Sequence, residues 1–98
     1  ANADWKSVPG YGVILANQAG AETWPITAAT FILLYKKPDD SAATAEALKF
    51  FNWAYGKGDA MAAELAYIPM PDAVVSDIQG MWASDIVGAD GKPLFAGS

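Results

Sequence analysis

Apolar and polar positions recur with different periods along the chain, and these periods predict the secondary structure. Residues 26–35 (ITAATFILLY) are apolar on both alternating faces and rich in β-branched and aromatic side chains. This pattern predicts a strand buried on both sides, although a buried helix is the competing interpretation. Residues 11–16 (YGVILA) predict a weak second strand. The rest of the loop-rich start, residues 1–25, contains Pro-Gly and Asn-Gln-Ala-Gly turn signals.

Three helices are predicted for the second half of the chain, at about residues 42–55, 60–67 and 72–86. The first follows two aspartates and a serine, which are typical of a helix N-terminus, and it ends at two glycines. The third starts just after a proline, a residue that suits the first turn of a helix. Residues 87–98 are expected to form a tail, in which residues 88–93 (GADGKP) are loose and polar.

The apolar spacing in two of these helices predicts the core. Leu48 and Phe51 recur on one face of the first helix, and Ile78 and Trp82 recur on one face of the third. We expect these four side chains to be buried.

The balance between strands and helices indicates an incomplete fold. A strand that is buried on both faces needs neighbours on both edges, yet at most one weak second strand is available. We therefore predict an α/β fold class, with one or two strands and three helices. Residues 1–98 are expected to form part of a larger α/β domain rather than a whole one, and the unmet strand pairing favours association with another chain.

Composition excludes several functions. The net charge is −5, with 11 acidic residues against 6 basic residues, and all six cations are lysine. Such a chain has no basic surface for nucleic acid. The sequence contains no histidine, cysteine or arginine, so a Ser-His-Asp triad, a thiolate nucleophile and a guanidinium clamp are all excluded. The longest apolar stretch is too short for a membrane span. We expect no enzyme activity.

Three segments, taken in order, carry a resemblance to one family. They are residues 17–34 (NQAGAETWPITAATFILL), 46–58 (EALKFFNWAYGKG), and 67–71 (YIPMP) leading to 91–94 (GKPL). Together they resemble the C-terminal quarter to third of the periplasmic phosphate-binding proteins that serve bacterial ABC-type phosphate importers. The most specific parts are residues 24–27 (WPIT) and 48–55 (LKFFNWAY), because the second combines three aromatic types within one expected helix.

The resemblance implies a fold, a function and a location. The fold would be part of one lobe of a two-lobed, type II-like periplasmic binding protein. The function would be capture of inorganic phosphate in the periplasm, together with the N-terminal part of the same protein and the membrane components of the importer, with no cofactor. The family's phosphate ligands include an arginine and a Ser-Gly-Thr run, and neither occurs here. No ligand-binding, catalytic or metal residue is therefore assigned to this segment.

Four sets of residues were weighed as sites, and a structural role is favoured for each. The tryptophans suggest a carbohydrate platform but are more often packing residues. One aspartate set lacks the calcium-loop spacing, and the other does not converge on one helix face as a glycosidase pair requires. The hydroxyls suit a strand better than an anion site. The sets are Trp24, Trp53 and Trp82; Asp39, Asp40 and Asp59; Asp72, Asp77 and Asp85; and Thr27 and Thr30.

A second function remains open from the sequence. The chain could instead be a self-contained α+β interaction module that binds no small molecule. The length of the natural protein would distinguish this module from a receptor segment.

Overall fold

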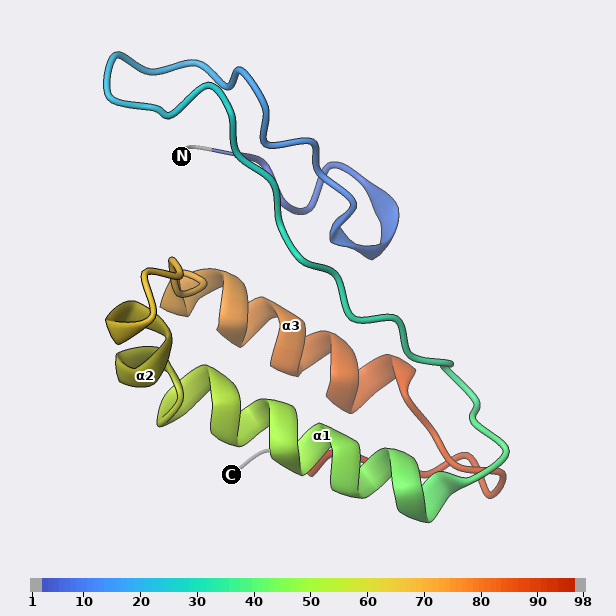
Figure 1. Ribbon diagram of the computed structural model, residues 1–98. Helices are drawn as coiled ribbons and strands as arrows, with labels where there is room; N and C mark the ends of the chain where they lie inside the picture. The colour runs from blue at the N-terminus through green and yellow to red at the C-terminus, as the bar shows by residue number, and fades with distance from the viewer. Residues whose placement is uncertain (1–2, 97–98) are drawn as a thin grey trace. The chain divides into compact units, whose positions relative to one another are not determined.

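The computed structural model describes residues 3–96 and divides them into two compact units, residues 3–33 and residues 34–96. Figure 1 shows the course of the chain, with the helices of the second unit labelled. In its described part, the first unit consists of turns, extended backbone and one short 3₁₀ helix, η1 (Pro9–Tyr11). A long turn is closed where the Asn17 amide donates to the Pro25 carbonyl at 2.8 Å.

The second unit contains the three α-helices of the described chain. Helix α1 spans Ser41–Gly56, α2 spans Asp59–Glu64 and α3 spans Asp72–Asp85. The sequence predicts helices at about 42–55, 60–67 and 72–86, so the largest difference is the earlier end of α2. Figure 1 shows α1 and α3 side by side and antiparallel, joined at one end through α2. Among residues 3–96, no helix combines the length and the apolar character that a membrane crossing requires.

The two ends of α1 have clear local causes. The Asp40 side chain caps the start of the helix by accepting a hydrogen bond from the Ala43 amide at 2.9 Å. At the other end, the Lys57 amide donates to the Trp53 carbonyl at 2.9 Å. A Cβ atom at Gly58 would lie 2.5 Å from the Ala54 carbonyl oxygen. Only glycine therefore fits this close turn between α1 and α2.

The core of the second unit lies between α1, α3 and the residues that follow α3. Leu48 is fully buried, and Trp82, Ile86 and Phe95 are buried around it. The Phe95 ring meets the edge of the Trp82 ring with centroids 5.3 Å apart. Burial also raises the pKa of the nearby Tyr55 hydroxyl above its ordinary value.

The predicted core face is present, but its members are not equally buried. Leu48 and Trp82 are buried as expected, whereas Phe51 and Ile78 are half-buried against the same cluster. One polar contact also joins the two long helices, because the Gln79 amide nitrogen donates to Asn52 Oδ1 at 2.7 Å.

The segment after α3 is packed, so the predicted loose tail is wrong for its described residues. The chain reverses over residues 86–94: the Gly88 amide donates to the Lys92 carbonyl at 2.9 Å, and the Leu94 amide donates to the Ile86 carbonyl at 3.0 Å. Gly91 has a φ of 77°, which a glycine adopts without steric cost. This reversal places Phe95 against Trp82 and completes the core.

The predicted α/β fold class, with one or two strands, is also wrong for this chain. In residues 3–96 the backbone forms no strand, and its β pairing is limited to an isolated antiparallel bridge between Val87 and Pro93. Residues 26–35 form no regular secondary structure, and most of their side chains are exposed; residues 11–16 form no strand either. A strand requires a hydrogen-bonding neighbour, and the described chain supplies none. The described structure is therefore helical and irregular. It does not contain the β-sheet that the predicted lobe of a binding protein would have.

Leu48→Ala is expected to destabilise the chain by about 2–5 kcal/mol, because it removes a fully buried side chain from the centre of the core. Denaturant unfolding followed by circular dichroism measures the change. Leu65→Ala is the matched control: Leu65 is 72% exposed, so its loss is expected to change stability by less than about 0.5 kcal/mol. Equal effects of the two substitutions would contradict the assigned core.

Candidate functional site

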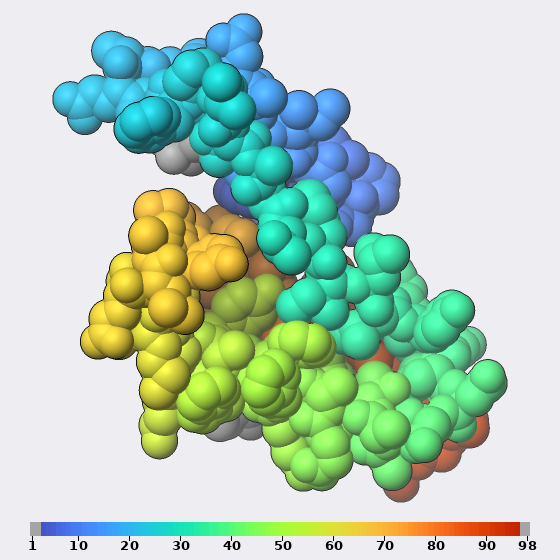
Figure 2. Space-filling model, in the orientation of Figure 1, coloured from blue at the N-terminus to red at the C-terminus, as the bar shows by residue number. Residues whose placement is uncertain are grey.

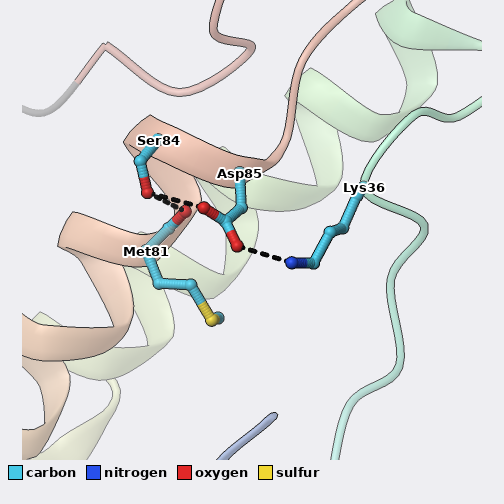
Figure 3. A network of polar contacts seen from close by, with 4 residues as sticks. All are labelled: Lys36, Met81, Ser84 and Asp85. Carbon is cyan, nitrogen blue, oxygen red and sulfur yellow. Dashed lines mark hydrogen bonds and ion pairs between the residues drawn. The ribbon is translucent and has the colours of Figure 1, made fainter. Parts of the chain in front are cut away.

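A small polar network holds the C-terminal end of α3. Lys36 Nζ lies 2.7 Å from Asp85 Oδ2, and the Ser84 hydroxyl lies 2.8 Å from Asp85 Oδ1 (Figure 3). The same hydroxyl lies 3.1 Å from the Met81 carbonyl oxygen, which is the alternative acceptor for its single proton. The Val87 amide donates to the Lys36 carbonyl at 2.9 Å. Residue 36 is therefore fastened to the end of α3 through both its side chain and its backbone.

The network also corrects an electrostatic mismatch. Asp85 is the last residue of α3, where the partial negative charge of the helix end disfavours a carboxylate. The Lys36 ammonium beside it, followed by the Ser84 hydroxyl, lowers the pKa of Asp85 below its ordinary value. Both partners are solvent-accessible. We therefore assign this ion pair a structural role, since neither group is buried as a proton-transfer group usually is.

The N-terminal ends of the helices are the places where a protein most readily binds an anion. Here each of them has an aspartate: Asp40 caps α1, Asp59 lies in the first turn of α2, and Asp72 lies in the first turn of α3. A phosphate approaching any of these ends would meet a protein carboxylate. The helix starts of this chain are therefore poor anion sites.

Three of the six lysines are also next to carboxylates in the described chain. Lys36 pairs with Asp85, Lys49 pairs with Glu46 at 2.6 Å, and Lys92 lies 3.6 Å from Asp90. Each of these cations is next to a carboxylate, so its charge is largely offset.

The structure places four of the aspartates considered above at separate positions. Asp40 caps α1, while Asp59 and Asp72 begin two other helices and Asp85 belongs to the network at the end of α3. Among residues 3–96, no group of three acidic side chains is placed to hold a metal ion.

The tryptophans and threonines also occupy separate positions. Trp82 is buried in the core, Trp53 is partly exposed on α1, and Trp24 lies in the first unit, exposed. The Thr27 hydroxyl donates to the Trp24 carbonyl at 3.2 Å, which is a local turn contact. Thr30 is exposed on the unpaired segment.

The most prominent feature of both units is exposed apolar surface. Ile26 and Leu33 in the first unit are 93% and 92% exposed, and Ile68 in the second is 93% exposed. Large exposed apolar areas on a protein commonly mark a surface that contacts another molecule. We therefore take the exposed apolar side chains of each unit, considered separately, as the candidate functional regions. Their other members are Val8, Ile14, Trp24, Phe31 and Ile32 in the first unit, and Tyr35, Phe50, Trp53, Met61, Leu65 and Tyr67 in the second.

Sequence reasoning missed two contributors to the structure. The role of Lys36 depends on a contact 49 residues away along the chain, and no local pattern signals it. Phe95 did have a signal, because apolar residues on both sides of a glycine-containing turn are typical of a chain reversal.

Asp85→Asn is expected to destabilise the second unit at neutral pH, because the folded state lowers the pKa of Asp85. The stabilisation is fully present above the ordinary carboxyl pKa of 3.8 and is lost as the pH falls through the lower folded-state pKa. Unfolding curves of the wild type and the variant should thus differ at pH 7 and converge in strong acid. Asp90→Asn, at an exposed pair in a turn, is the control. A difference between wild type and Asp85→Asn that does not depend on pH would contradict the network.

Comparison with known proteins shows what this chain is similar to. No family model matches it. A phosphate-binding protein PstS of Pasteurella multocida is 44% identical over 95 residues, which are 97% of this chain and 28% of that protein. The PstS protein of Haemophilus influenzae is 46% identical over 85 residues, 87% of this chain and 25% of the relative. That of Xylella fastidiosa is 39% identical over 84 residues, 86% of this chain and 23% of the relative.

The chain thus spans about a quarter of the length of the curated relatives it matches. The identity is spread over almost the whole chain and does not reflect one short motif. The resemblance predicted from the sequence is confirmed: nearly all of this chain is similar to one segment of the PstS phosphate-binding proteins.

Proposed function

We propose that this chain is the C-terminal segment of a periplasmic receptor that captures inorganic phosphate for an ABC importer. The observation that carries the proposal is its 44% identity, over 97% of its length, to a phosphate-binding protein. Because the chain matches only 28% of that protein, phosphate capture is an activity of the whole receptor. The membrane components of the importer are then partners of the whole receptor.

Within the receptor, the segment contributes packing helices and not the phosphate ligands. The aspartates at all three helix starts and the paired lysines support this role. The sequence also has no arginine, the side chain best suited to bidentate phosphate recognition. Capture and release of phosphate require no covalent bond to be made or broken. The proposed protein is therefore not an enzyme and needs no cofactor.

The remaining, larger part of the receptor is the proposed partner of the exposed apolar surface. A chain that leaves Ile26, Leu33 and Ile68 almost fully in water gains stability when another apolar surface covers them. The alternative, a self-contained α+β module, has less support, because residues 3–96 form no sheet.

The chain alone is expected not to bind inorganic phosphate at micromolar concentrations in isothermal calorimetry. By contrast, a full-length chimera is expected to bind it, when this chain replaces the 95 matching residues of the Pasteurella multocida protein. The unmodified Pasteurella multocida protein is the positive control. The physical reason is that the chimera restores the ligands that this segment lacks.

Two results would count against the proposal. Micromolar binding by the chain alone would place phosphate ligands inside this segment. A chimera that folds, as judged by circular dichroism, but does not bind phosphate would show that the segment is not equivalent to its counterpart.

A further inference from the structure

Helix α1 has two apolar sides, and only one of them is used inside its own unit. The inner side carries Leu48, Phe51 and Tyr55, which pack in or against the core. At 100° per residue, Phe50 and Trp53 point to the opposite side. Their rings stack with centroids 6.0 Å apart, yet the side chains are 58% and 44% exposed. Figure 2 shows the green to yellow-green residues of α1 at the surface of the molecule.

Charged residues flank this aromatic pair along the same side of the helix. Glu46 lies four residues before Phe50, and Lys57 lies four residues after Trp53, so helical spacing brings all four into one stripe. Glu46 is already paired with Lys49 at 2.6 Å. An aromatic centre with a charged rim is the usual composition of a protein–protein interface, and tryptophan is among the residues that contribute most to binding energy.

A helix that is apolar on both sides is typical of a helix buried between two layers of protein. We infer that the outer side of α1, centred on Phe50 and Trp53, docks against the remaining part of the phosphate receptor. This inference rests on the proposed function, and it names the surface through which the segment joins its partner. The relatives support this occupant, since about three quarters of their length has no counterpart in this chain. The partner surface is expected to be apolar opposite the two rings.

The first test measures side-chain accessibility without any substitution. Hydroxyl-radical footprinting with mass spectrometry is applied to the 98-residue chain and to the full-length chimera with the Pasteurella multocida protein. Phe50 and Trp53 are expected to be oxidised severalfold more slowly in the chimera. Trp82 is the internal control, because it is already buried in this chain and should be slow in both. Equal rates at Phe50 and Trp53 in the two proteins would overturn the inference.

The second test uses paired charges. Phe50→Glu with Trp53→Glu is expected to lower the melting temperature of the chimera by about 5 °C or more. In the 98-residue chain the loss should be clearly smaller, because both side chains lie outside the buried cluster and the Phe50 ring meets the half-buried Phe51 ring at its edge. The matched control is Ala73→Glu with Ser76→Glu, which places two carboxylates at the same spacing on exposed positions of α3. Equal losses in the chain and the chimera, or equal losses for test and control pairs, would also overturn the inference.

The outcomes separate this inference from the proposed function. A chimera that binds phosphate while Phe50 and Trp53 stay reactive retains the function and rejects the docking surface. A chimera with protected rings that does not bind phosphate supports the surface and rejects the function. If sedimentation shows the 98-residue chain to be a dimer in which both rings are already protected, the occupant is a second copy and the inference is wrong.

Discussion

The burial of Leu48 against Trp82 is the contact on which the second unit depends. It brings α1 and α3 side by side, and the chain reversal after α3 then adds Phe95 to the same cluster. Burying a leucine side chain stabilises a protein by about 1.5–3 kcal/mol, whereas exposed ion pairs contribute little. The pair between Lys36 and Asp85 is exposed. The apolar core therefore positions the polar network at the end of α3, and the network does not hold the helices together.

This core is small in relation to the apolar content of the chain. Hydrophobic residues make up 53% of the sequence, yet the buried cluster of the second unit has four members. The surplus lies on the outer side of α1, on the residues after α2, and along the extended residues 26–35. These positions have the composition of an interior but are in water. As one layer of a larger protein, the same sequence would bury the apolar side chains that it leaves exposed when alone.

The helices could be read from the sequence because their causes are local. The Asp40 cap, the close turn at Gly58 and the apolar spacing around Leu48 all act within a few residues. The strand at residues 26–35 could not be read in this way. Its β-branched and apolar side chains favour a strand, but a strand also needs a neighbour that local sequence does not supply, and these residues form no regular secondary structure. The candidate surface follows from the same shortage, whereas the position of Lys36 depends on a distant contact.

The charge distribution is consistent with the proposed place of this segment in a phosphate receptor, where it would not contact phosphate. Its helix starts have carboxylates, three lysines are paired, and the net charge is −5. Placed at a phosphate site, these groups would repel the ligand. In the proposed receptor, they would leave a phosphate site undisturbed if they lay more than about 10 Å from it, because water and salt largely screen exposed charges beyond that distance. Changes in the core of this segment would then alter how much receptor is folded, and the affinity of each folded molecule for phosphate would stay the same.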